Sequence, residues 1–227
     1  MSQGPSVAVE TPAVWPMYRA MVGVGLLCGV LIVGVFQLTK PVIARNRAEA
    51  LQRAIFQVLP DARSSGSFRQ TAEGRFELVD GVSGRGPLVH GGYDDAGRLV
   101  GLAIEAEGMG YQDVIRVLYG YAFDRDAIIG IRVLESRETP GLGDKIETDS
   151  AFLQNFERLD VSLTGDLAAI ANPIVFVKRG QKDHPWQIDG ITGATISSAA
   201  IADMLGRSTA DRLPRIRSRL GDFQVAE

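Results

Sequence analysis

The sequence predicts an α+β fold, in which an N-terminal transmembrane helix precedes one domain with an antiparallel sheet and flanking helices. The first observation behind this prediction is a stretch of twenty uncharged residues at 20–39. The second is two pairs of apolar, strand-like runs, each pair joined by a short polar turn. The third is a segment with helical periodicity near the end of the chain. The 227 residues, 45% of them hydrophobic, suffice for one folded domain and an anchor.

The apolar stretch from Ala20 to Thr39 predicts a membrane-spanning helix. Twenty residues of helix extend about 30 Å, which matches the hydrocarbon core of a bilayer. Trp15 and Tyr18 precede the stretch, as aromatic residues do at a membrane interface. A cleaved signal peptide is the alternative, but its apolar core has only about 7–15 residues before a small-residue cleavage site. We therefore expect an uncleaved helix over residues 18–40, in contact with membrane lipid.

The charges near this span predict its orientation. On the N-terminal side, Arg19 is the basic residue close to the span, whereas four basic residues follow it: Lys40, Arg45, Arg47 and Arg53. Cytoplasmic segments carry an excess of Lys and Arg, so this distribution predicts that the large C-terminal part lies in the cytoplasm.

The remaining parts of the chain are separated by composition. The small, polar and Pro-containing N-terminus predicts disorder. After the span, apolar residues recur at helical spacing from Leu51 to Leu59, and Pro60 ends this pattern. A Ser- and Gly-rich linker is expected at 61–67. The predicted division is a disordered N-terminus at 1–17, a transmembrane helix at 18–40, a linking helix at 41–60 and one domain at 61–227.

Two hairpins form the centre of the predicted sheet. Their turns are Asp94–Gly97 and Asp124–Asp126, whose residue types favour tight turns between apolar runs. A short fifth strand and a C-terminal helix complete the domain. The expected strands are 87–93, 98–104, 114–123, 127–134 and 174–178, and the expected helix is 198–205 with a further helical segment to Leu220.

Composition excludes several kinds of site. The net charge of −3 argues against a nucleic-acid partner. The single cysteine, Cys28, cannot form an intrachain disulfide or hold an iron–sulfur cluster. The two histidines, His90 and His184, have no spaced partner, so no metal site is expected. Any redox chemistry would therefore require an organic cofactor.

Three glycine-rich loops are candidates for a binding site. In Glu138–Glu147, Gly141 and Gly143 would let the chain turn tightly and push Leu142 outward. The Gly108–Asp113 loop is similar and holds Tyr111. From composition alone, an ordinary turn remains an alternative interpretation of both loops.

The third loop, with the sequence DGITGATISS at 189–198, precedes the C-terminal helix. Its physical interpretation is open between two roles. Thr195, Ser197 or Ser198 could simply cap the helix. Alternatively, the free N–H groups and the partial positive charge of the helix N-terminus could hold a phosphate, with Gly193 leaving room for it.

The segment Asp189–Thr195 resembles the flavinylation motif, D-x-x-[ST]-G-A-T, of the FMN-binding domain family. The resemblance implies that a dedicated flavin transferase esterifies Thr195 with the phosphate of FMN. It also implies a role in attachment for Asp189, whose carboxylate could help to recruit the Mg²⁺ that the transferase uses.

The loop Glu138–Ile146 resembles the corresponding loop of the G subunit of the Rnf electron transport complex, and the C subunit of the Na⁺-translocating NADH:quinone reductase is similar. Both have one N-terminal span followed by one FMN domain, so the resemblance covers about Tyr18 to Leu220. The compact chain favours the Rnf protein. The implied FMN-binding residues are Thr195 (covalent), Thr192, Gly193, Ala194, Glu138, Thr139, Gly141, Leu142, Gly143 and Tyr111.

The resemblance implies an electron-carrying flavoprotein subunit with no substrate turnover of its own. The complex would be an ion-translocating ferredoxin:NAD⁺ oxidoreductase of the bacterial inner membrane, with other membrane and peripheral subunits as partners. It also implies a periplasmic FMN domain, which conflicts with the charge count around the span. Two alternatives remain: the C subunit of the quinone reductase, and a non-redox, membrane-anchored interaction or sensor module.

Overall fold

The computed structural model describes residues 14–79 and 88–224. Helix α1 (Val14–Val58) is one continuous helix of 45 residues. The sequence predicted a span and a separate linking helix, but Pro41 removes one backbone donor without ending the helix. Residues 14–17, expected to be disordered, already belong to α1, and the other residues of that predicted segment lie outside the described part.

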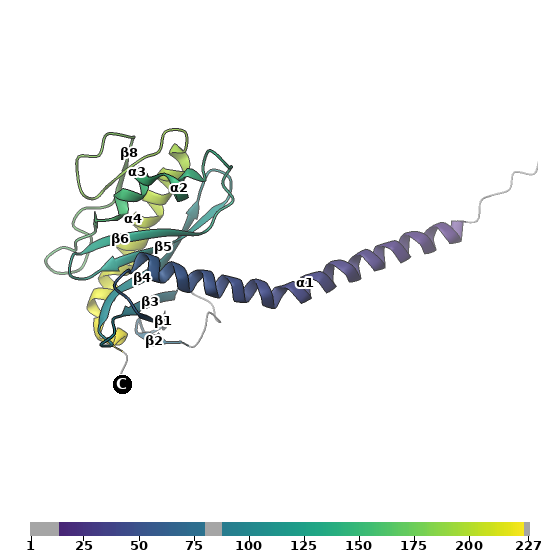
Figure 1. Cartoon of the computed structure of the whole chain (residues 1–227), viewed down its shortest axis with the longest axis horizontal. Helices are drawn as coiled ribbons and strands as arrows, with labels where there is room; N and C mark the ends of the chain where they lie inside the picture. Colours follow the sequence, from purple (N-terminus) through teal and green to yellow (C-terminus); the bar gives the residue numbers. More distant parts are fainter. Residues whose placement is uncertain (1–13, 80–87, 225–227) are drawn as a thin grey trace, which may run out of the picture. The chain divides into compact units, whose positions relative to one another are not determined.

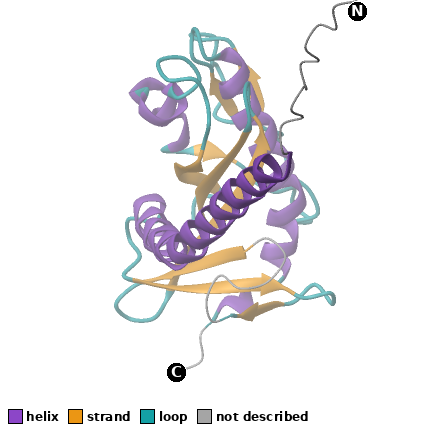
Figure 2. Ribbon diagram, turned by 90° about the vertical axis from the view of Figure 1, so that its right-hand side faces the viewer, coloured by secondary structure: helices purple, strands orange, loops and turns teal. Residues whose placement is uncertain are grey.

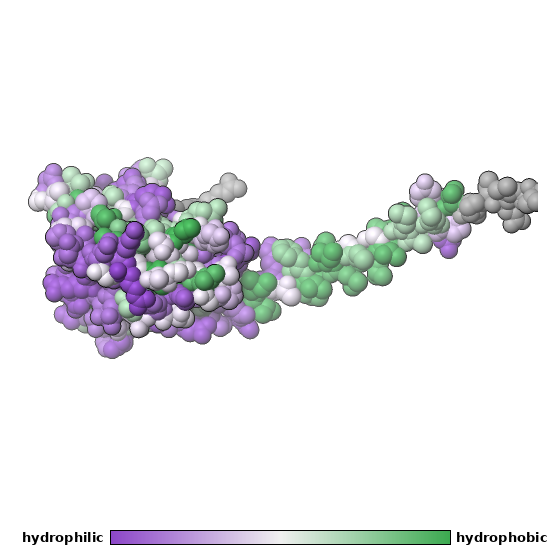
Figure 3. Space-filling model, turned by 90° about the horizontal axis from the view of Figure 1, so that it is seen from above, coloured by the Kyte–Doolittle hydropathy of each residue, from purple (hydrophilic) through white to green (hydrophobic). Residues whose placement is uncertain are grey.

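By length and composition, α1 can cross a membrane. Its most apolar window of 18 residues is 0% buried inside the protein, whereas the core helix of a soluble protein would be mostly buried. Figure 3 shows an almost unbroken apolar surface along this stretch of α1. The chain divides into two compact units, the first ending at Arg47 and the second beginning at Ala48.

The second unit is built on a seven-stranded antiparallel sheet (Figure 1). Its strands are β1 (Ser64–Gln70), β2 (Phe76–Leu78), β3 (Leu88–Tyr93), β4 (Leu99–Met109), β5 (Val114–Ala122), β6 (Ala127–Glu135) and β7 (Leu159–Asp160), in the spatial order β2-β1-β3-β4-β5-β6-β7. A separate parallel pair consists of β8 (Val175–Val177) and β9 (Gln187–Asp189). The helical elements are α2 (Lys145–Thr148), α3 (Ser150–Leu153), η1 (Gln154–Phe156), α4 (Thr195–Ser218) and η2 (Leu220–Phe223).

The two predicted hairpins are confirmed. In the first, Asp94 Oδ1 accepts hydrogen bonds from the backbone N–H groups of Ala96 and Arg98, both at 2.9 Å. This bonding closes the turn between β3 and β4, which pair antiparallel. In the second, β5 and β6 pair antiparallel on either side of the predicted turn. The helix expected at 198–205 also forms, as part of the longer α4.

Both faces of the central strands are buried, each by a different helix. On one face, Leu102, Ile104 and Tyr119 belong to the main core, together with Ile201 and Leu205 of α4. The opposite face packs against the end of α1, whose cluster has these buried members: Ala54, Ile55, Val58, Leu59, Ala62, Ala103 and Leu118. Figure 2 shows helices on both sides of the strands. The end of α1 therefore belongs to the core of this unit.

Two glycines let the end of α1 pack closely against the sheet. A Cβ on Gly120 would overlap the carbonyl oxygen of Val58. A Cβ on Gly130, which pairs with Gly120 across β5 and β6, would lie 3.0 Å from Val58 Cα. The missing side chains let the helix end lie directly on the backbone of the sheet.

One expected linker is wrong, and one expected strand is confirmed but lies outside the main sheet. The segment 61–67, expected to be a linker, supplies the first half of β1, because pairing along β3 from Ser64↔Tyr93 to Arg69↔Leu88 holds these short polar residues extended. The strand expected at 174–178 forms as β8, but it pairs only with β9 and stays outside the main sheet. The first residue of the strand expected at 87–93 lies outside the described residues.

Candidate functional site

The start of α4 opens onto a cavity of about 300 Å³. Three segments enclose it: the loop between β4 and β5, the loop after β6, and the turn into α4. Its lining residues are Tyr111, Glu138, Thr139, Leu142, Gly143, Gly193, Ala194, Thr195, Ile196 and Ser197. This volume lies at the lower end of the range for small-molecule sites, about 300–1,000 Å³.

The cavity brings together most of the residues that the sequence singled out. Eight of the predicted FMN-binding residues line it, although they come from three separate loops. Thr192, Gly141 and Asp189 are not among the lining residues. Sequence reasoning missed Ile196 as a site residue and considered Ser197 only as a cap. Their position in the first turn after Thr195 was the available signal.

No side chain caps the N-terminus of α4. The residue at the cap position is Ala194, which has no side-chain hydrogen bond to offer. The alternative in which Thr195, Ser197 or Ser198 is the N-cap is therefore wrong. Ser198 instead donates its hydroxyl to the carbonyl oxygen of Ala194, at 2.9 Å.

The first backbone N–H groups of α4 consequently lack partners. In the described part of the chain, none of the N–H groups of Thr195, Ile196 and Ser197 has a hydrogen-bond acceptor. Thr195 itself is exposed and lines the cavity. Free donors and the partial positive charge of a 24-residue helix therefore face a space that an anion can enter.

A buried carboxylate, Glu138, ties the three walls of the cavity together. The residue is only 7% exposed. Oε2 accepts a hydrogen bond from the Ser197 hydroxyl at 2.5 Å, and Oε1 accepts one from the Gln112 backbone N–H at 3.0 Å. Thr139 also contacts Gln112, because its hydroxyl donates to Gln112 Oε1 at 3.0 Å. Glu138 thus orients the loops, with both oxygens already engaged by protein donors.

Two glycines leave the space that Glu138 occupies. A Cβ on Gly143 would overlap Glu138 Oε2 and would lie 2.9 Å from the Ser197 hydroxyl. A Cβ on Gly110 would overlap Glu138 Oε1. These glycines are required by the packing around the carboxylate. Gly141 differs, because its φ of 77° turns the chain and, apart from its chain neighbours, no atom of the described residues lies within 4 Å of its Cβ position.

Apolar side chains stand at the mouth of the cavity. Tyr111, Leu142 and Ile196 are 67%, 53% and 56% exposed, respectively. Each comes from a different wall, so they can contact a flat apolar group from several sides. Exposed apolar residues gathered around a cavity are typical of a binding site.

Asp189 lies on β9 and holds a neighbouring turn. Its Oδ2 accepts a hydrogen bond from the Gly180 backbone N–H at 2.9 Å, and its Oδ1 accepts one from the Gln181 N–H at 3.3 Å. Asn155 fixes the backbone of Asp189 from both sides, at 3.0 and 3.1 Å. Among the described residues, no group of three or more His, Cys, Asp or Glu side chains could hold a metal ion. The Mg²⁺ role of Asp189 stays a prediction.

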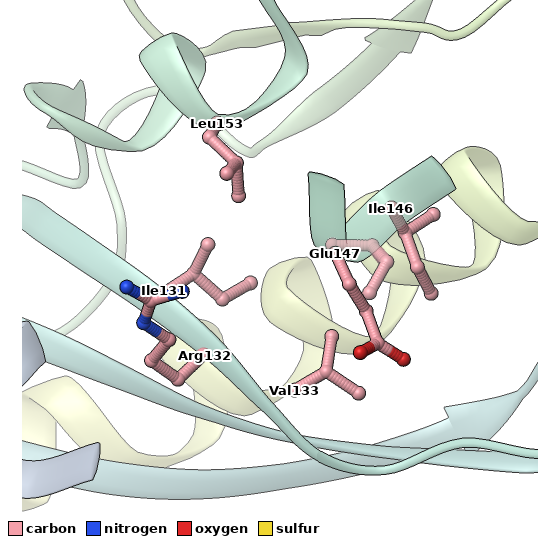
Figure 4. Close-up of a pocket in the computed structure, with 7 residues that line it drawn as sticks. Ile131, Arg132, Val133, Ile146, Glu147 and Leu153 are labelled. Atoms are coloured by element: carbon pink, nitrogen blue, oxygen red, sulfur yellow. The ribbon is translucent and has the colours of Figure 1, made fainter. Parts of the chain in front are cut away.

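A second, smaller cavity of about 80 Å³ lies between β6, the short helices and α4 (Figure 4). Its lining residues are Ile131, Arg132, Val133, Ile146, Glu147, Leu153 and Ile201. Burial, followed by repulsion from Asp144, raises the pKa of Glu147. The volume is well below the usual size of a cofactor site.

His90 is fully buried on the sheet face that does not carry α4. Its Nδ1 lies 2.9 Å from the Ser67 hydroxyl, and its Nε2 lies 3.6 Å from Glu105 Oε1. Arg116 pairs with the other oxygen of Glu105 at 2.8 Å. The contact with His90, followed by the charge of Arg116, holds the pKa of Glu105 below its usual value. These four residues join β1, β3, β4 and β5 and have no part in the cavity.

Comparison with known proteins supports the same site. A family model described as an FMN-binding domain matches residues 110–209, which include all three loops of the cavity. Solved structures of NqrC, the C subunit of the Na⁺-translocating NADH-quinone reductase, share the fold. The protein from Shewanella oneidensis has a TM-score of 0.58 at 18% identity, covering 77% of this chain and 96% of that one. The protein from Parabacteroides distasonis has a TM-score of 0.54 at 19% identity, covering 81% and 96%. The fold and the cavity therefore define an FMN-binding domain behind an apolar N-terminal helix.

A second family model, the RnfG N-terminal region, matches residues 21–58. Two curated relatives are each named as the G subunit of an ion-translocating oxidoreductase complex. The one from Methanosarcina acetivorans is 32% identical over 190 residues, which cover 82% of this chain and 87% of the relative. The one from Escherichia coli K12 is 33% identical over 206 residues, which cover 84% and 87%. The chain belongs to the RnfG family, the G subunits of ion-translocating oxidoreductase (Rnf) complexes.

Proposed function

We propose that this chain carries FMN bound covalently to Thr195 and relays electrons within an ion-translocating ferredoxin:NAD⁺ oxidoreductase. The observation that carries the proposal is the uncapped N-terminus of α4, where exposed Thr195 lines a cavity of about 300 Å³. This place lies inside the segment that matches the FMN-binding domain model. The chain would hold and orient the flavin and would turn over no substrate of its own.

The residues at the cavity fit FMN. A phosphate ester on Thr195 would retain a negative charge beside the free N–H groups of the first helical turn. Tyr111, Leu142 and Ile196 offer apolar surface for the flavin ring. Glu138 and Gln112 would keep the two glycine-rich loops in place around it. Thr139, Gly141, Thr192 and Gly193 would shape the loops.

Attachment requires a flavin transferase and a flavin nucleotide that carries a leaving group on its phosphate. Thr195 Oγ1 would form the new P–O bond and lose its proton, and the leaving group would depart from the same phosphorus. Asp189 would act in this maturation step by helping to recruit the Mg²⁺ of the transferase. Once bound, FMN supplies reversible electron transfer, while the protein sets its position and surroundings.

The family places this protein in a complex with other subunits, and the apolar helix is compatible with a single-pass anchor. We propose that residues 18–40 span the bacterial inner membrane, in contact with lipid, and that the FMN domain is periplasmic. The positive-inside count favours the opposite orientation. Reporter proteins fused to the C-terminal end of the FMN domain distinguish the two orientations. If the domain is periplasmic, fused alkaline phosphatase should be active, and a fluorescent protein that folds only in the cytoplasm should be dark. The reverse pattern would contradict a periplasmic domain.

The test of the function uses the full chain purified from membranes after co-expression with a flavin transferase. The wild-type chain should show flavin absorbance that dithionite bleaches and air restores. Thr195→Val should be folded and colourless under denaturing conditions, because it lacks the acceptor hydroxyl. A wild-type chain that stays colourless beside an actively flavinylated control protein would favour a non-redox interaction module instead.

A further inference from the structure

Lys145, at the start of α2, lies beside the turn that leads into α4. Apart from the chain neighbours of Gly193, Lys145 Nζ is the only described atom within 4 Å of a Cβ placed on that residue, at 3.9 Å. Gly193 has a φ of 86°, which turns the chain at this point and leaves the space open. The ammonium group therefore adjoins the entrance to the helix N-terminus.

This ammonium group has no partner among the described residues. No hydrogen bond or ion pair within that part of the chain involves Lys145 Nζ, although other cations near this end of the molecule are paired. Arg179 lies 3.8 Å from Asp149, and Lys182 donates to Asn155 Oδ1 at 3.1 Å. Lys145 is thus a positive charge left available to a ligand.

This charge adds to the positive potential at the N-terminus of α4. Lysine is disfavoured near a helix N-terminus, because the helix already carries partial positive charge there. At α4 the two positive potentials adjoin, and no side chain caps the helix. An anion bound between the ammonium group and the helix N-terminus would be attracted by both. The arrangement therefore suits a bound anion.

We propose that Lys145 is a positioning residue that pairs with the phosphate of FMN at the N-terminus of α4. The proposal rests on the function proposed above and assigns the cation that the phosphate meets. A phosphodiester on Thr195 retains one negative charge, and free FMN carries about −1.5 to −2 at neutral pH. Lys145 would hold the phosphate near Thr195 before attachment and neutralise the ester afterwards.

The binding affinities for free FMN and riboflavin distinguish a contact between Lys145 and the phosphate from a purely structural role of Lys145. The full chain, made without the transferase, is titrated with FMN and with riboflavin, which has the same ring and no phosphate. Lys145→Gln should weaken FMN binding by about tenfold, as expected for loss of a charge-assisted hydrogen bond, and should leave riboflavin binding unchanged. Lys145→Arg should restore most of the FMN affinity, and added salt should weaken FMN binding to wild type more than to Lys145→Gln.

Arg219→Gln is the matched control. It removes one positive charge from the C-terminal end of α4, about 36 Å along the helix from Thr195. It should leave the affinity for both flavins unchanged.

The outcomes separate the two proposals. In one outcome, Lys145→Gln weakens the binding of FMN and riboflavin equally, or weakens neither, while the wild type still accepts FMN from the transferase. The proposed pairing of Lys145 with the phosphate is then wrong, and the proposed function stands. If the wild type binds neither flavin and accepts no FMN from an active transferase, both proposals fail.

Discussion

Glycines serve opposite purposes in two regions of this domain. On the face that packs against the end of α1, Gly120 and Gly130 make room for the backbone around Val58. In the loops that enclose the cavity, Gly141 and Gly193 have positive φ, and almost no described atom occupies the space beside them. The first pair leaves space that the chain itself fills, whereas the second pair turns the chain around space left for a ligand.

This contrast separates stability from binding. A side chain added where the chain fills the space must displace packed atoms and destabilise the fold. A side chain added where the space is open mainly strains the backbone and obstructs whatever binds there.

Gly120→Ala should give the largest loss of stability, about 1–3 kcal/mol, because its methyl group would overlap the Val58 carbonyl. The amount of FMN attached per folded chain should not change. Thermal unfolding of the purified protein measures the first effect, and absorbance per folded chain measures the second. Gly165→Ala, where nothing lies within 4 Å and φ is ordinary, should change stability by less than about 0.5 kcal/mol.

Gly193→Ala should show the converse pattern. The left-handed backbone at φ 86° costs about 1–2 kcal/mol with a Cβ, although no atom of the protein is displaced. The shifted turn should slow attachment by about tenfold or more, because small misplacements of a reacting group are costly. Initial rates of flavin transfer, followed by in-gel fluorescence, report this effect. Attachment to folded Gly193→Ala at the wild-type rate would contradict the distinction.

Glu138→Gln should have an intermediate effect on both properties. The amide has one acceptor oxygen in place of two, so either the Ser197 hydroxyl or the Gln112 N–H loses its partner. A loss of about 1–2 kcal/mol and slower attachment should result. Glu157→Gln, at an exposed position, is the control and should alter neither. Equal behaviour of the two variants would show that Glu138 does not hold the loops.

Glu105→Gln should have the smallest effect at the cavity, because Glu105 belongs to the His90 and Arg116 cluster. The folded-state pKa of Glu105 is below its unfolded value, so its ionised form stabilises the fold above the unfolded pKa. This contribution is lost as the pH falls through the folded pKa. The unfolding temperatures of wild type and variant should therefore converge as the pH falls through the folded pKa. A constant difference in acid would contradict this account, and flavin attachment should not change.

Local sequence patterns predicted the centre of the sheet well. Turn residues such as Asp94 determine the hairpins through bonds to their own neighbourhood, so a short stretch of sequence is sufficient. The strand β1 could not be predicted in this way, because its polar residues are held extended by β3 and not by their own preference. The continuity of α1 through Pro41 could not be predicted either, because a proline usually marks the end of a helix.

The candidate site was predicted from motifs, and the contacts within it were not. Thr195 and the glycine-rich loops stood out because their residue types are unusual in sequence. Glu138 was expected to contact the cofactor, yet both of its oxygens bind protein donors that lie 26 and 59 residues away along the chain. The proximity of Lys145 to Gly193 also depends on folding, because Lys145 begins α2 and Gly193 lies in the turn before α4, 48 residues further along the chain.

The most direct test of the central claim is the intact mass of the full chain after co-expression with an active flavin transferase. Esterification with FMN, with loss of one water, adds about 438 Da to the chain. Wild type and Thr192→Ser should both carry this increment, because Thr195 is intact and the motif is kept in each, and Thr195→Val should not carry it. An increment that persists in Thr195→Val, or is missing from wild type, would contradict the assignment of Thr195 as the residue that holds FMN.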